Sequence, residues 1–284
     1  MTSVKYGGRP LDAMLAYLDL RQKNYPFLSN ALAVYRQVFA IQDRFCKLFE
    51  LDGPADLGTC NGDGPLVPGR LPGLDPDQPL RVLAEISNAL TAAAPDRGSQ
   101  IQAARRACEC DDILLRRSYR NELNPILETL RLLTLNPFYE KFAREIVPRI
   151  EEVPWRLGYC PVCGETPSVA AYKASAGVRY VQCRLCRTQW DVPRIGCIFC
   201  DCEESDKLSY LQADDVTAHR VEICDACGGY LKVVDERALM KTSILHVEEL
   251  FMSALDQEAI TRGYTPGRSR ARKEEDSLYG SQSQ

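Results

Sequence analysis

Four Cys-x-x-Cys pairs decide the fold of this chain, and they lie within residues 155–236, WRLGYCPVCGETPSVAAYKASAGVRYVQCRLCRTQWDVPRIGCIFCDCEESDKLSYLQADDVTAHRVEICDACGGYLKVVDE. The stretch runs twice through one pattern: a Cys-x-x-Cys pair, two short alternating strands around a turn, a second pair and a further strand. The two segments between pairs have 19 and 23 residues. The expected hairpin strands are 169–173 with 178–182, and 208–212 with 216–223. Each repeat is therefore predicted to be one small hairpin module.

The spacing of the eight paired cysteines predicts two metal sites. A Cys-x-x-Cys turn directs two thiolates at one ion, and two such turns at the end of a hairpin complete a tetrahedral cage of four sulfurs. Gly164 and Gly228 follow the second cysteine of their pairs and suit a turn with positive φ. We expect sequential pairing, although a cross-brace that joins the first pair to the third has compatible spacing. The expected metal ligands are Cys160, Cys163, Cys183 and Cys186 in one module and Cys197, Cys200, Cys224 and Cys227 in the other.

A cage of four sulfurs leaves no coordination position for water or substrate, which excludes a hydrolytic metal site. Either iron or zinc suits such a site. Histidine is scarce, and we interpret His219 as a strand residue rather than a ligand. We find no candidate catalytic residues and no residues that would bind another cofactor, so the chain is not predicted to be an enzyme.

Five of the 13 cysteines stand outside the four pairs. Cys202 is either a spare thiol beside the second site or a replacement for Cys200 in a C-x4-C pairing. We interpret Cys46 as a core residue and Cys60, in a loop rich in Gly, Pro and Asp, as an exposed thiol. Cys108 and Cys110 point to different faces of one helix, which favours packing over metal binding.

The chain before residue 155 has helical patterning. Helices are expected over 11–20, 26–50, 80–95, 98–120 and 121–135, with a loop over 52–79, a break at Asn136-Pro137 and a last short helix over 137–147. The predicted fold class is α+β: a helical N-terminal domain followed by two tandem rubredoxin-like, or zinc-ribbon-like, modules with four cysteines each. The expected division is a helical domain over 1–154, modules over 155–194 and 195–236, a C-terminal helix over 237–262, and a polar, disordered tail over 263–284.

Composition and charge exclude several classes of function. Lys and Arg number 35 against 39 Asp and Glu, a net charge of −4, so there is no basic excess for nucleic acid. No run of apolar residues reaches the roughly 18 that a membrane helix needs, and the N-terminus lacks the apolar core of a secretory signal. We therefore expect a cytoplasmic protein without membrane insertion, whose cysteines are reduced and hold metal rather than form disulfides.

The segments WRLGYCPVCGETPSVA, RYVQCRLCRTQW, CIFCD and VEICDACGGYLKVVDE resemble the formate dehydrogenase accessory protein family, FdhE, over Trp155 to Glu236. The resemblance implies a cytoplasmic maturation factor, chaperone-like in action, that binds the catalytic subunit of a respiratory formate dehydrogenase before its export. It further implies that the eight paired cysteines bind iron in a rubredoxin-like manner and that no catalytic residues are present. It leaves the oligomeric state open.

Two alternative functions are a zinc-ribbon protein that binds nucleic acid and a rubredoxin-like electron carrier. The first is disfavoured because residues 156–235 hold 9 Lys and Arg against 11 Asp and Glu. The second is chemically possible with iron in a cage of four sulfurs. It is disfavoured because an electron carrier has no need of about 150 residues of helical domain.

Overall fold

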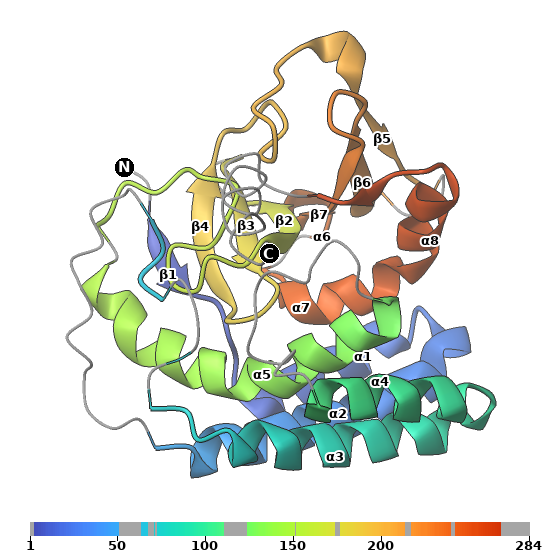
Figure 1. Cartoon of the computed structure of the whole chain (residues 1–284). Coiled ribbons are helices and arrows are strands. Elements are labelled where there is room, and N and C mark those ends of the chain that lie inside the picture. Colours follow the sequence, from blue (N-terminus) through green and yellow to red (C-terminus); the bar gives the residue numbers. More distant parts are fainter. Residues whose placement is uncertain are drawn as a thin grey trace, which may run out of the picture.

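A layer of helices and one mixed sheet make up the fold (Figure 1). The computed structural model describes residues 3–50, 64–67, 71, 73–110, 124–150, 152–173, 177–213, 217–239 and 242–267. Within these residues the α+β fold class is confirmed, with a helical N-terminal part followed by two rubredoxin-like four-cysteine modules. The predicted turns at 174–177 and 214–215 lie mostly or wholly outside the described residues.

The helical layer forms because amphipathic segments bury one face each. Its members are α1 (Leu11–Gln22), α2 (Ser29–Leu48), α3 (Asp77–Ala93), α4 (Gly98–Cys110) and α5 (Pro125–Ile146), with 3-10 turns η1 (Pro26–Leu28), η2 (Pro95–Arg97) and η3 (Val147–Arg149). The core between them is built on fully buried apolar side chains such as Val38, Val82 and Leu130. Residues 111–123, expected to be helical, lie outside the described residues.

The expected helix break at Asn136-Pro137 is wrong, because α5 continues through it. A proline inside a helix frees the carbonyl four residues earlier, here that of Leu133. The Gln42 side chain of α2 donates a hydrogen bond to this carbonyl at 2.9 Å. The Asn136 amide in turn donates to Leu185 O at 2.6 Å, in the first four-cysteine module. Gln42 therefore compensates for the missing helical hydrogen bond, and Asn136 ties this part of α5 to the first module.

The two predicted hairpins share one sheet. Its strands are β1 (Val4–Tyr6), β2 (Pro167–Tyr172), β3 (Arg179–Cys183), β4 (Thr188–Val192), β5 (Leu208–Leu211), β6 (His219–Cys224), β7 (Gly229–Asp235) and β8 (Thr265–Pro266), and the turn η4 (Ser205–Lys207) precedes β5. The strand order is β1-β4-β3-β2-β7-β6-β5, with β8 against β7. Strands β2 and β7 pair in parallel, Val169 opposite Lys232, and join the two modules edge to edge. His219 begins β6, as predicted.

Two parts of the expected domain division differ from the structure. Val4–Tyr6, assigned to the helical domain, is a strand that pairs with β4 of the first module, Val4 opposite Trp190. The single helix expected over 237–262 is replaced by α6 (Glu236–Leu239), α7 (Leu245–Glu248), η5 (Glu249–Met252) and α8 (Ser253–Thr261). Just before α7, Ser243 donates its backbone N–H and its hydroxyl to the buried Glu236 carboxylate of α6, at 2.8 and 2.9 Å.

The prediction of a disordered tail over 263–284 is wrong for its first residues. Thr265 and Pro266 form β8 and pair in parallel with Gly229 and Tyr230. Residues 268–284 lie outside the described residues. The other domain boundaries stay predictions.

A buried cluster of charges fastens α1 to the second module. Glu248 of α7 is fully buried and receives hydrogen bonds from Tyr17 and, at 3.1 Å, from Arg21 of α1. Its Oε2 also lies 2.6 Å from His219 Nε2 of β6. Burial opposes ionisation of Glu248, but the His219 hydrogen bond and the Arg21 charge together hold its pKa below the usual value. The Glu248 carboxylate therefore joins α1, near the N-terminus, to α7 and to β6 of the second module.

Candidate metal centres

All four Cys-x-x-Cys pairs adopt the same turn. Gly164 and Gly228 have φ values of +65° and +68°, as predicted, and each donates its N–H to the carbonyl of the first cysteine of its pair, at 2.8 Å. Arg187 and Asp201 occupy the equivalent positions with φ values of +62° and +58°, although neither is a glycine. Their N–H groups donate to Cys183 O and Cys197 O at 3.3 and 2.9 Å. The sequence signal for the turn is therefore the cysteine spacing, because only two of the four turns have a glycine at the position with positive φ.

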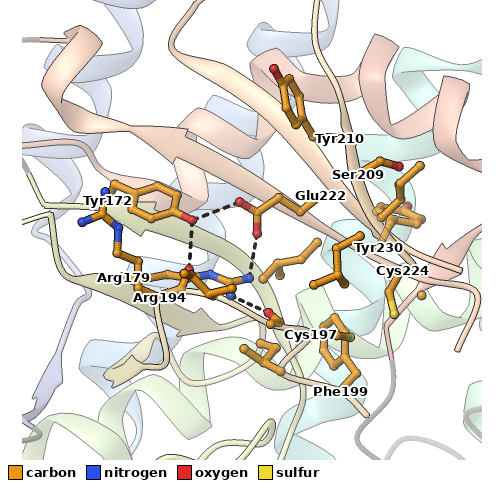
Figure 2. A pocket seen from close by; sticks show the side chains of 17 residues that line it. Tyr172, Arg179, Arg194, Cys197, Phe199, Ser209, Tyr210, Glu222, Cys224 and Tyr230 are labelled. Atoms are coloured by element: carbon orange, nitrogen blue, oxygen red, sulfur yellow. Dashed lines mark hydrogen bonds and ion pairs between the residues drawn. The ribbon is translucent and has the colours of Figure 1, made fainter. Parts of the chain in front are cut away.

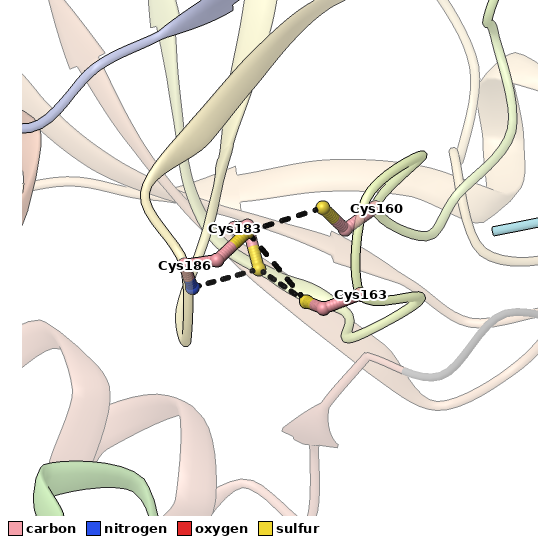
Figure 3. A group of neighbouring side chains, drawn as sticks. All are labelled: Cys160, Cys163, Cys183 and Cys186. Carbon is pink, nitrogen blue, oxygen red and sulfur yellow. Dashed lines mark hydrogen bonds between the residues drawn. The ribbon is translucent and has the colours of Figure 1, made fainter. Parts of the chain in front are cut away.

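The first pair of turns brings four thiols together (Figure 3). Cys160 and Cys163 lie just before β2, and Cys183 and Cys186 lie at the end of β3. Sγ–Sγ distances are 3.4 Å for Cys160–Cys186, 3.5 Å for Cys163–Cys183 and 3.6 Å for Cys163–Cys186. The N–H groups of Leu185 and Cys186 point at the Cys183 sulfur, each at 3.4 Å. Such donors stabilise a thiolate.

The second pair of turns repeats the arrangement. Cys197 and Cys200 precede β5, and Cys224 and Cys227 lie between β6 and β7. Sγ–Sγ distances are 3.8 Å for Cys197–Cys227 and 3.7 Å for Cys200–Cys224. In both groups all four sulfurs lie within 4.8 Å of one another. The sequential pairing of the turns is therefore the one observed, and the cross-brace is not.

The sulfur geometry fits a tetrahedral metal ion. Four sulfurs each about 2.3 Å from one ion stand roughly 3.8 Å apart at the corners of a tetrahedron. The five separations given above, 3.4 to 3.8 Å, approach this value, and the other sulfur pairs lie within 4.8 Å. The donor set of four thiols suits iron or zinc equally well. Each group could therefore hold one such ion.

The electrostatics of the groups favours a bound cation. Burial, followed by the neighbouring cysteines, raises the pKa of Cys160 well above its usual value. In the second group the hydrogen bond with Cys227, followed by burial, raises the pKa of Cys197. Several thiolates packed together repel one another and lose their hydration. A divalent cation at the centre compensates for both costs, so binding couples to proton release.

An ion network lies against the first group. Glu165, fully buried two residues after Cys163, receives hydrogen bonds from Arg131 of α5 at 3.2 Å and from Arg184 at 3.1 Å. Glu128 of α5 pairs with both arginines, at 2.8 and 2.7 Å. This network fastens the first module to the helical layer. Sequence reasoning missed it, because residues from α5 and from the module come together only in the fold.

A pocket of about 220 Å³ lies beside the second group (Figure 2). Its wall is largely apolar and is made in part by Cys197, Phe199 and Cys224. At its polar end the Glu222 carboxylate accepts hydrogen bonds from Arg179 at 2.8 Å and from Tyr172 at 3.1 Å. No sequence motif indicated the pocket, which forms between strands of both modules.

The cysteines outside the four pairs do not join either group within the described residues. Cys202 is partly exposed and lies outside the second group, which contains Cys200, so the C-x4-C pairing is not adopted. Cys46 is buried, as predicted for a core residue. Cys108 is also buried, and burial raises its pKa to about 12. Cys60 and the side chain of Cys110 lie outside the described part of the chain.

The fold and its two groups define a class of protein: a helical domain joined to paired four-cysteine ribbons within one sheet. Residues 159–194 match the family described as FdhE, central domain. The resemblance to the FdhE family is thereby confirmed.

Curated relatives agree over a limited part of the chain. "Protein FdhE" of Escherichia coli O127:H6 is 38% identical over 109 residues, which is 37% of this chain and 34% of the relative. "Protein FdhE" of Shigella boydii serotype 18 matches with the same identity and coverage. The match therefore spans about a third of the length of these curated relatives.

A solved structure agrees over nearly the whole chain. The crystal structure of the FdhE protein from Pseudomonas aeruginosa has a TM-score of 0.63 and covers 93% of this chain and 96% of its own, at 22% identity. This likeness shows a shared fold. None of the helices in the described residues combines the length and the apolar character of a membrane span.

Proposed function

We propose that this protein is an accessory factor in formate dehydrogenase maturation, which binds the catalytic subunit of a respiratory formate dehydrogenase in the cytoplasm before export. The resemblance to FdhE supplies the partner. The observation that carries the proposal is the pair of four-thiol groups built into one sheet on an FdhE-like fold. On this proposal the protein binds and protects its partner, as a chaperone does, and catalyses no reaction.

The metal in both groups is proposed to be iron, held by the eight paired cysteines. When bound, iron in such a cage supplies a one-electron redox couple and stabilises the fold around it. Closed coordination by four sulfurs supports a role in binding rather than in substrate chemistry. In the first group the turn N–H groups orient the Cys183 sulfur, and complete burial of the four cysteines excludes water.

The proposal is tested by combining a deletion strain with a pull-down. Loss of the protein should abolish respiratory formate oxidation, and the tagged wild-type chain should retain the immature catalytic subunit. A Cys183→Ser chain should lose both functions, because one missing sulfur opens the first cage. Cys202→Ser is the matched control, since Cys202 lies close to the second group but outside it. Normal formate oxidation in the deletion strain, with no catalytic subunit in the pull-down, would refute the proposal.

A further inference from the structure

We propose that the second group, Cys197, Cys200, Cys224 and Cys227, is an exchangeable metal site for a soft divalent ion, whereas the first group retains its ion permanently. We further propose that Tyr264–Gly267, called here the C-terminal strap, slows exchange at the second group. The inference rests on metal binding in the proposed function and adds different roles for two groups of the same chemistry.

The two groups differ in burial. All four cysteines of the first group are 0% exposed. In the second group Cys197 is 9% and Cys224 is 3% exposed, while Cys200 and Cys227 are only partly buried. Exchange of a metal requires an incoming ligand to reach a sulfur, so the second group is the one open to chelators and to other thiols.

The first group is covered by other parts of the fold. Backbone N–H groups of Leu66 and Val67 donate to Pro161 O and Val162 O, each at 2.9 Å, inside the first cysteine turn. The Asn136 amide donates to Leu185 O inside the other turn. The segment 64–67 therefore covers the first turn, while Asn136 and the buried Glu165–Arg131 pair bring α5 of the helical layer against the group. Access to its sulfurs therefore requires displacement of the segment 64–67 or separation of α5 from the module.

The second group borders open space instead. The pocket of about 220 Å³ is lined by Cys197, Cys224 and the exposed Tyr210 (Figure 2). The exposed side chain of Ile195 also lines it. The neighbouring strand β5 is the last strand of the sheet, so among the described residues no further strand covers this side. The pocket therefore extends to Cys197 and Cys224, while Cys200 and Cys227, which do not line it, are the partly exposed members of the group.

The C-terminal strap covers the second group from another side. Thr265 N–H donates to Gly228 O at 2.9 Å and Gly267 N–H donates to Tyr230 O at 3.1 Å, which places the strap along the last cysteine turn. The Tyr264 hydroxyl donates to Asp225 Oδ1, between Cys224 and Cys227, at 2.6 Å. Gly267 packs directly against the ring of Phe199, which lies in the turn between Cys197 and Cys200. The strap thus contacts both turns of the second group.

The attachment of the strap is small enough to open locally. Thr265 and Pro266 are exposed, and β8 pairs with β7 over only two residues. Short, exposed segments with few hydrogen bonds open far more often than a packed core. Opening of the strap frees the last cysteine turn, whereas the cover of the first group is the packed helical layer. The first group is therefore closed to solvent, whereas access to the second group depends on opening of the C-terminal strap.

The experiment uses the full chain loaded with two Zn²⁺ ions, because zinc avoids oxidation during the measurement. Release to an excess of EDTA is followed by native mass spectrometry, and freed thiols are alkylated and mapped by peptide. We expect two phases that differ by roughly ten-fold or more in rate, with the fast phase at the second group. Equal rates, or a fast phase that maps to the first group, would overturn the inference.

Two truncations test the strap. A chain that ends at Gly263 lacks it, and a matched chain that ends at Gly267 keeps it. Loss of the strap should raise the fast rate several-fold and leave the slow rate unchanged, while the matched chain should behave as the full chain does. Tyr264→Phe, which removes only the hydrogen bond to Asp225, should give a smaller rise. An unchanged fast rate in the chain ending at Gly263 would refute the gating role.

Failure of this inference can be told apart from failure of the proposed function. A chain that binds no metal would refute metal binding itself, and a chain that binds two ions with equal release rates would refute only the difference between the sites. The pull-down of the catalytic subunit depends on neither rate.

Discussion

Glu165→Gln should weaken the attachment of the first module to the helical layer. Glu165, Glu128, Arg131 and Arg184 form a neutral cluster of two acids and two bases, in which Glu165 is fully buried and Arg131 is 3% exposed. The substitution leaves one net positive charge in this cluster. Removal of one partner from a buried ion pair costs about 3–5 kcal/mol. Glu128 still pairs with both arginines, so we expect the lower part of the range, about 3 kcal/mol.

The assay is urea unfolding of the metal-loaded protein, followed by far-UV circular dichroism. Glu145→Gln is the control, because Glu145 pairs with Lys141 on the surface at 3.5 Å and such pairs are worth about 0.5 kcal/mol or less. The double variant Arg131→Leu, Glu165→Leu should lose less stability than the two single variants added together, because the pair is removed as a unit. A Glu165→Gln chain as stable as the control would refute the proposed role of the network.

Three further predictions concern the metal sites, the acid response and α5. Cys160→Ser should lower the unfolding midpoint more than Cys224→Ser, since only the first group is sealed beneath the helical layer; equal losses in thermal melts would contradict this difference. Because the pKa of Glu248 is held below its usual value of 4.5, its contribution to stability is present above that pH and is lost as pH falls through the lower, folded value. Glu248→Gln should therefore flatten the acid limb of a stability-against-pH curve, and an unchanged limb would refute this. Gln42→Leu should cost about 1–3 kcal/mol in urea unfolding by leaving Leu133 O without its hydrogen bond, and a neutral effect would show that water replaces Gln42.

The features that local sequence encodes could be predicted. Cysteine spacing within each hairpin is a short-range property, so the membership of both groups followed from the four pairs. The positive φ values of Gly164 and Gly228 followed as well. The same conformation at Arg187 could not be predicted from residue type, because arginine rarely adopts it and the turn around the sulfurs imposes it there. At Asp201 residue type gives only a weak signal, since aspartate adopts positive φ more often than most residues do.

The features that depend on distant residues could not be predicted. Pro137 indicates a helix end by local rules, and Gln42, about ninety residues earlier, overrides that signal. The parallel pairing of β2 with β7 joins modules that look independent in sequence. The strap residues Thr265 and Pro266 have no strand signal of their own and pair only because β7 leaves its edge open beyond β2.

We propose above that this protein binds two metal ions and holds an immature formate dehydrogenase subunit. The most direct test of this proposal is purification of the tagged chain from native cytoplasm, with metal analysis and protein identification on the same sample. We predict two iron ions per chain when the sites are full, with the second more readily lost, and the catalytic subunit in the same fraction. A fully folded chain that contains no metal and carries no such subunit would contradict the account.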